Sequence, residues 1–105
     1  MRGLFVTGTD TGVGKTEVSC ALVAEARAGG LDLVAMKPAE SGVTPGEPSD
    51  SERLRAAAGG AGDPALVCPY RFAAPLAPAV AARLAGVEVR LELILDAARA
   101  LAARH

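Results

Sequence analysis

The sequence predicts an α/β fold of the P-loop NTPase kind, in which helices flank a parallel sheet. Three observations near the start of the chain support this. A short β-rich run at residues 4–7 closes on Gly8, which is typical of a buried parallel strand. The glycine-rich segment GTDTGVGKT, residues 8–16, leads into the almost continuously apolar residues 18–24, which predict a helix that stops at the glycine pair 29–30. A second apolar run at residues 31–36 completes a βαβ unit with a right-handed crossover.

The rest of the chain is predicted from caps, helix breakers and periodicity. Residues 49–52 read Ser-Asp-Ser-Glu, which is the spacing of a capping box, and they start a helix that runs to about residue 58. The segment 69–78 is expected to be irregular because it holds three prolines. The last of these, Pro78, suits the first position of a short helix over residues 79–84. A final helix carries an apolar stripe formed by Leu91, Ile94, Leu95, Ala98, Leu101 and Ala102.

Length and composition fit one packed domain over residues 1–105, or a part of a larger one. Half of the residues are hydrophobic and 22% are charged, which excludes wholesale disorder. Aromatic residues make up 3% and the net charge is −1, so the chain offers nucleic acid neither a stacking platform nor a basic footprint. The first apolar run is too short for a signal peptide or a membrane span, and we expect a cytoplasmic protein with reduced cysteines.

Residues 8–16 are predicted to bind the phosphates of a nucleotide. Such a loop needs glycines that let backbone N–H groups turn inward, a lysine for the β- and γ-phosphate oxygens, and a hydroxyl that holds magnesium. Gly14, Lys15 and Thr16 supply these groups directly before a predicted helix, whose positive end faces the anion. Thr9 takes the usual place of the first glycine, so the loop is a variant, and a chance glycine turn is the alternative. The predicted nucleotide-binding residues are Thr11, Gly12, Val13, Gly14, Lys15 and Thr16.

Further motifs narrow the class of P-loop protein. The segment KPAESG, residues 37–42, follows the second predicted strand, and several shorter motifs follow it in order. Together with GTDTGVGKT, they resemble the N-terminal half of dethiobiotin synthetase, the family that closes the ureido ring in biotin synthesis. The resemblance covers all 105 residues. The shorter motifs are Ser49-Asp50, PYRF at residues 69–72, PLAP at residues 75–78, and Ala81-Ala82.

The resemblance implies an ATP-dependent reaction on small molecules. One amine of 7,8-diaminononanoate takes up CO2 as a carbamate, ATP phosphorylates this carbamate, and the second amine closes the ring and releases phosphate. Two anions must therefore meet, and positioning with charge neutralisation would carry most of the catalysis. The resemblance also implies that Mg2+ accompanies ATP and that the full-length protein is a homodimer.

Individual roles are carried over from the family's motifs. Lys15 and Lys37 are implied to be the catalytic cations, and Lys37 follows a predicted parallel strand, where α/β sheets bind ligands. Thr16 and Asp50 are implied to be Mg2+ ligands, because hard cations prefer oxygen donors. The implied substrate-binding residues are Thr11, Lys37 and Ser41.

Structural alternatives stay open for several of these residues. Lys37 could be a solvated lysine at a strand end, and Asp50 a carboxylate that caps a helix. The Ser41 hydroxyl could satisfy a loop. The neighbouring Glu40 is expected to be a solvated charge.

The chain is also expected to be incomplete as an enzyme. The family continues with a strand that ends in Glu-Gly-Ala-Gly-Gly and brings a second magnesium carboxylate, so the predicted sheet is truncated before its central strands are complete. The activity of the chain alone is left open. Two other interpretations compete, namely a non-catalytic remnant and a switch ATPase of the partitioning or nitrogenase-iron-protein kind that acts on protein partners. Asp10 argues against the switch ATPase, because those loops carry a signature lysine at that place.

Overall fold

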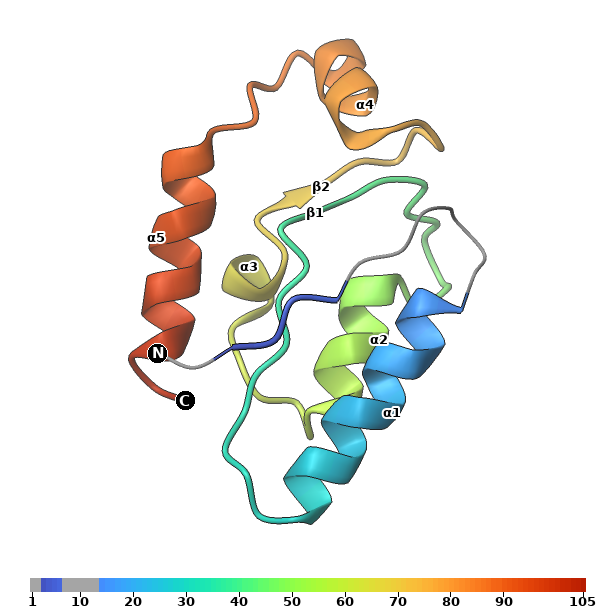
Figure 1. Ribbon diagram of the computed structural model, residues 1–105. Coiled ribbons are helices and arrows are strands. Elements are labelled where there is room, and N and C mark those ends of the chain that lie inside the picture. The colour runs from blue at the N-terminus through green and yellow to red at the C-terminus, as the bar shows by residue number, and fades with distance from the viewer. Residues whose placement is uncertain (1–2, 7–13) are drawn as a thin grey trace.

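The structure, a computed structural model, describes residues 3–6 and 14–105 (Figure 1). Within these residues, two short parallel strands are surrounded by helices, which confirms the predicted α/β class. In chain order the elements are α1 (Lys15–Ala28), β1 (Ala39–Glu40), α2 (Asp50–Ala57), α3 (Pro64–Val67), β2 (Tyr70–Arg71), α4 (Pro78–Ala85) and α5 (Leu91–Ala102).

Four helices begin where local signals predicted them. α1 starts directly after Gly14 and ends before Gly29. At the start of α2, Ser49 and Glu52 exchange side-chain and backbone hydrogen bonds, so the predicted capping box is confirmed. α4 has Pro78 as its first residue, and α5 covers most of the periodic final segment. The short helix α3 was not predicted.

The sheet forms from segments other than the predicted ones. β1 and β2 pair in parallel, with Ala39 opposite Tyr70 and Glu40 opposite Arg71. Hydrogen bonds extend this pairing to the Lys37 N–H, which donates to the Val67 carbonyl at 2.8 Å. β2 therefore lies inside the proline-rich segment that was expected to be irregular. Proline is compatible with a two-stranded ladder when it flanks the paired residues.

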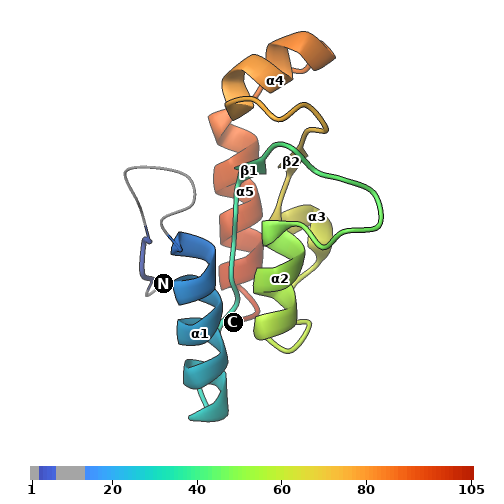
Figure 2. The ribbon, with the colours of Figure 1, turned by 90° about the vertical axis from the view of Figure 1, so that its right-hand side faces the viewer.

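The strands predicted at residues 4–7 and 31–36 are wrong for the residues that the structure describes. Residues 4–6 and 31–36 form no strand there, and Thr7 lies outside the described residues. Leu4 and Phe5 are 81% and 90% exposed. In Figure 1 residues 4–6 cross in front of the segment that leads from α1 to β1, but Figure 2 shows that the two segments lie apart. Apolar, β-rich residues favour a strand, but a strand also needs a neighbouring backbone to pair with.

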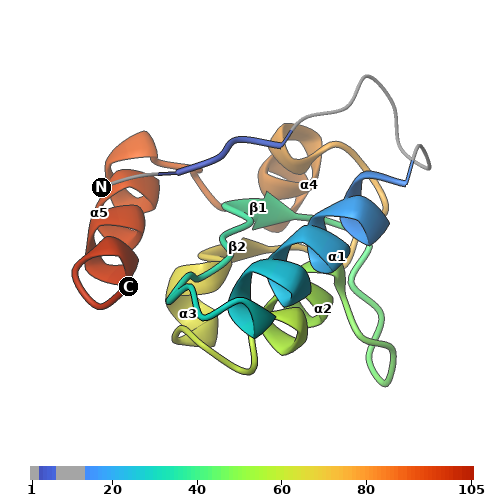
Figure 3. The same ribbon diagram turned by 60° about the horizontal axis from the view of Figure 1, so that its bottom comes forward.

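The buried residues gather in two small clusters. In one, the rings of Tyr70 and Phe72 stack 6.4 Å apart on the alanines of α4. In the other, Val67 and Leu101 pack around Gly62, so that α3 contacts α5. Figure 3 shows α5 on the far side of the sheet from α1 and α2, which lie side by side.

The apolar stripe of α5 is only partly covered. Leu101 is buried, but Leu91 and Leu95 are exposed. The predicted periodicity is thus present, and the covered part of the helix comprises Ile94, which packs against the Tyr70 and Phe72 cluster, and the buried Ala97 and Leu101. No helix of the described residues is long and apolar enough to cross a membrane.

Candidate functional site

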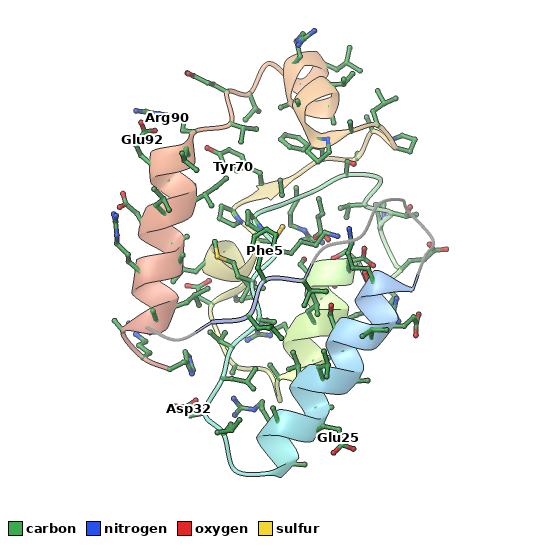
Figure 4. All side chains as sticks on the ribbon, viewed as in Figure 1. Phe5, Glu25, Asp32, Tyr70, Arg90 and Glu92 are labelled. Atoms are coloured by element: carbon green, nitrogen blue, oxygen red, sulfur yellow. The ribbon has the colours of Figure 1, made fainter. Side chains whose placement is uncertain are left out.

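A cavity of about 710 Å³ brings together residues from α1 and from the segment that precedes β1. Lys15 and Thr16 line it from the first turn of α1, and Lys37 lines it from the other side. Residues 3–6 form a third wall, from which Phe5 projects in Figure 4. The lining therefore combines two lysines with mostly apolar side chains. The apolar lining includes Leu22, Val23, Leu33, Val34, Met36 and Leu54.

The backbone takes a left-handed conformation directly before α1. Gly14 has φ 82°, which glycine adopts without strain. It directly precedes the helix, so Lys15 and Thr16 lie at the positive end of the α1 dipole. Three other predicted nucleotide-binding residues, Thr11, Gly12 and Val13, lie outside the described residues.

Lys37 and Asp50 form an ion pair in which Nζ lies 3.1 Å from Oδ2. The two residues are 13 positions apart in the chain, and both are partly buried. Burial raises the pKa of the Asp50 carboxyl, but the Lys37 ammonium, the Thr16 hydroxyl and Arg53 lower it by more, so the carboxylate stays ionised. The implied magnesium ligands, Thr16 and Asp50, therefore lie together beside Lys37.

Charged groups link the start of α1 to α2. The Arg53 guanidinium lies 2.7 Å from the Glu17 carboxylate, and the Thr16 hydroxyl lies near enough to Asp50 to lower the pKa of that carboxyl. Arg53 also lies 3.9 Å from Asp50 on its own helix. Carboxylates and a guanidinium thus alternate across the α1–α2 contact.

The structure gives both Lys37 and Asp50 a charged partner. The Lys37 side chain is 28% exposed and paired, so it is no longer the freely solvated lysine of the alternative interpretation. The cap of α2 is formed by Ser49, and the Asp50 carboxylate turns to Lys37 instead. Lys37 therefore lines the cavity, and Asp50, in the first turn of α2, is held beside it by the ion pair.

The Ser41 hydroxyl is placed differently. It donates a hydrogen bond to the Leu76 carbonyl and so joins the segment after β1 to the segment before α4. Among the described residues, the lining of the cavity does not include Ser41. This is the loop-satisfying arrangement that was left open from the sequence.

Glu40 is a residue whose place the sequence did not reveal. It is 4% exposed, so the expectation of a solvated charge is wrong. Its carboxylate accepts a hydrogen bond from Arg71 Nε at 2.9 Å and another from the Ser51 N–H at 3.0 Å. Only the pairing of β1 with β2 puts Arg71 opposite Glu40, so no local signal in the sequence could have identified this contact.

The donor set also limits which metals could bind. Among residues 3–6 and 14–105, no three His, Cys, Asp or Glu side chains come together as a metal cluster. Thr16 and Asp50 offer a hydroxyl and a carboxylate, which suit a hard cation that keeps part of its water shell.

Comparisons with known proteins place this geometry in context. The AAA domain family matches residues 2–105. Over its full length the chain is 70% identical to the ATP-dependent dethiobiotin synthetase BioD of Anaeromyxobacter sp. (strain Fw109-5), of which it covers 47%. It is 50% identical over 99 residues to the protein of that name from Caulobacter vibrioides (strain NA1000 / CB15N), and this match covers 91% of the chain and 45% of that protein.

The chain thus spans about half the length of the curated relatives it matches. The resemblance drawn from the sequence motifs is confirmed by these identities, which extend over the whole chain. On the match of residues 2–105, the chain belongs to the AAA domain family.

Proposed function

We propose that this chain supplies the phosphate- and carbamate-binding side of an ATP-dependent dethiobiotin synthetase. The observation that carries the proposal is the convergence of Lys15, Thr16 and Lys37 on one cavity, with Asp50 paired to Lys37 at 3.1 Å. The 70% identity to synthetases of that name supports it. The complete protein acts as a cytoplasmic homodimer, as the resemblance implies.

The proposed reaction joins three substrates. One amine of 7,8-diaminononanoate forms an N–C bond to CO2 and loses a proton, which gives a carbamate. A carbamate oxygen then attacks the γ-phosphorus of ATP, the bond to the bridging oxygen breaks, and ADP leaves. The second amine attacks the carbamate carbon, the C–O bond to the phosphoryl group breaks, and inorganic phosphate leaves. The attacking nitrogen loses a proton as the ureido ring closes.

The two lysines supply the positive charge that these reaction steps require. The carbamate and the triphosphate are both anions, and they must approach within reacting distance. Lys15, at the positive end of α1, neutralises the β- and γ-phosphates, and Lys37 faces the carbamate and the transferred phosphoryl group. The ion pair with Asp50 restricts the movement of the Lys37 ammonium beside the cavity that Lys15 also lines.

Mg2+ would be held by the Thr16 hydroxyl and the Asp50 carboxylate, which are the oxygen donors brought together at the site. When bound, it supplies further positive charge to the phosphates. Thr11 and Ser41 complete the proposed substrate contacts, although Ser41 would have to release the Leu76 carbonyl to do so.

A chimera tests the proposal directly. This chain would replace the matching 105 residues of the Anaeromyxobacter synthetase, and dethiobiotin and phosphate would be measured with ATP, Mg2+, bicarbonate and the diamine. We expect ring closure by the chimera and a loss of at least about a hundredfold in kcat for Lys37→Ala, with little change in ATP affinity. Arg99→Ala, which removes an exposed cation on α5, is the control and should keep full activity.

Two results would contradict the proposal. A folded chimera that forms no dethiobiotin would show that the chain lacks this function. ATP hydrolysis that proceeds at full rate without the diamine would instead favour a switch ATPase.

A further inference from the structure

We propose that Glu40 is a positioning residue that sets the geometry of the Lys37–Asp50 pair. The inference rests on the proposed function, because it assumes that this pair serves the phosphate site. Glu40 acts together with Ser49, Ser51, Glu52 and Arg71, and we call these five residues the Glu40 clasp.

The Glu40 carboxylate is bound at the first turn of α2. One oxygen, Oε1, accepts a hydrogen bond from the Ser51 N–H at 3.0 Å. The other, Oε2, accepts one from the Ser51 hydroxyl. Ser51 directly follows Asp50, so a carboxylate from β1 occupies the positive end of α2, where free N–H groups need acceptors.

Arg71 closes the clasp from β2. Its Nε lies 2.9 Å from Glu40 Oε2, and its Nη2 lies 2.6 Å from Glu52 Oε1 and 3.1 Å from Ser49 Oγ. One guanidinium thus joins both strands to the cap of α2. The hydrogen bonds from Ser51 and Arg71 outweigh the effect of burial on Glu40 and hold its pKa below the ordinary value, so the clasp stays charged.

The clasp adjoins both members of the ion pair. Lys37 precedes Glu40 by three residues on the same hydrogen-bonded segment, and its N–H is fixed on the Val67 carbonyl. Asp50 lies between Ser49 and Ser51, which are both in the clasp. Among the described residues, the cavity lining does not include Glu40, so it would act through Lys37 and Asp50 rather than on a ligand.

The cost of burying charge favours a positioning role over simple stabilisation. In the Glu40–Arg71 pair the carboxylate is buried while the Arg71 side chain is 40% exposed, so the desolvation of Glu40 offsets much of the attraction. What the contacts specify is geometry, because the Glu40 oxygens accept hydrogen bonds from Ser51 and Arg71. The planar guanidinium donates in a fixed fork to Glu40, Glu52 and Ser49. The geometry specified here is the approach of α2 to the segment that carries Lys37.

The first test reads the ion pair without any turnover. Lys15 and Lys37 are the two lysines of the sequence, so limited acetylation followed by peptide mass spectrometry reports each separately. In Glu40→Ala, the ion pair between Lys37 and Asp50 should form less of the time. Lys37 should then be acetylated about two- to fivefold faster relative to Lys15. Glu92→Ala, which removes an exposed carboxylate at the start of α5 (Figure 4), is the matched control and should leave the ratio unchanged.

A second variant covers the case in which Glu40→Ala fails to fold. Arg71→Lys keeps a positive charge near Glu40 but loses the fork that reaches Ser49 and Glu52. It should raise the relative reactivity of Lys37 in the same direction. An unchanged ratio in the folded variants would overturn the proposal, whatever the activity of the enzyme.

The second test separates positioning from general structural support. In the chimera, Glu40→Ala should lower kcat by about tenfold or more, with KM for ATP nearly constant. In a Lys37→Ala background the same change should lower kcat by less than about twofold, because the group that it positions is already gone. An equal loss in both backgrounds would overturn the proposal. An inactive chimera with the expected change in acetylation would instead count against the proposed function alone.

Discussion

The helices α1 and α2 lie side by side, but they are held in different ways. None of the fourteen residues of α1, all of them described, is buried, and its apolar Val18 and Leu22 are 56% and 49% exposed. α2 is shorter, yet it buries Ser51 and Leu54, has a capping box and is bound at its first turn by the Glu40 carboxylate. Apolar content therefore does not determine which of the two is better anchored.

The difference matters because the candidate site draws on both regions. Lys15 and Thr16 come from the loosely covered α1, whereas Asp50 comes from the anchored α2. Contacts of Thr16 and Glu17 with α2 hold the start of α1 in place. Polar groups on α2 thus anchor the half of the candidate site that carries Asp50, and the half that carries Lys15 and Thr16 lies against it.

The largest expected effect tests the α1 side of the site. Lys15→Ala in the chimera should lower turnover by more than about a hundredfold, because a cation at the transferred phosphate is lost. It should also weaken ATP binding by about 2–5 kcal/mol, measured by isothermal titration. Unchanged ATP affinity in Lys15→Ala would show that the start of α1 does not bind the phosphates.

The two phenylalanines of the chain allow the core and the cavity wall at residues 3–6 to be compared with the same residue type. Phe72 is 6% exposed in the core, and Phe5 is 90% exposed beside the cavity. In the 105-residue chain, Phe72→Ala should reduce the free energy of unfolding by about 3–5 kcal/mol, measured by urea denaturation. Phe5→Ala should change it by no more than about 0.5 kcal/mol. Equal losses would mean that residues 3–6 pack against the body in solution.

Two glycines of similar φ sharpen the comparison. Gly30, after α1, has φ 94° and open space where an alanine methyl would lie, whereas Gly62 has φ 93° and would bring a methyl within 2.7 Å of Val34 and 2.8 Å of Val67. Gly30→Ala should cost only the backbone strain, about 1 kcal/mol. Gly62→Ala should cost about 1–3 kcal/mol more because of overpacking. Similar thermal unfolding of the two variants would show that the core around Gly62 can give way.

The smallest expected effects concern polar contacts at the helix starts. Ser49→Ala removes the cap of α2 and an acceptor of the Arg71 guanidinium, and it should cost about 1 kcal/mol. Glu17→Ala breaks the exposed pair with Arg53 on the α1 side and should cost less than about 0.5 kcal/mol. Urea denaturation at low and high salt measures both. A larger loss for Glu17→Ala would reverse the assignment of the anchored helix.

Local signals in the sequence predicted four of the five helices in the described residues. The capping box at Ser49, the proline at position 78 and the period of residues 91–102 each act within one or two helical turns. The same holds for Gly14 and Lys15, whose place before and inside α1 follows from neighbouring residues alone. These features need no distant partner, so the sequence by itself determined them.

Features that depend on distant partners were decided by the tertiary structure. The predicted strands at residues 4–6 and 31–36 found no pairing partner among the described residues, whereas β1 and β2 paired across the prolines. Lys37 meets Asp50 across 13 residues of sequence, and Glu40 meets Arg71 across 31. Strand pairing and the burial of a charge both need a partner from elsewhere in the chain, and only folding determines which segment supplies it.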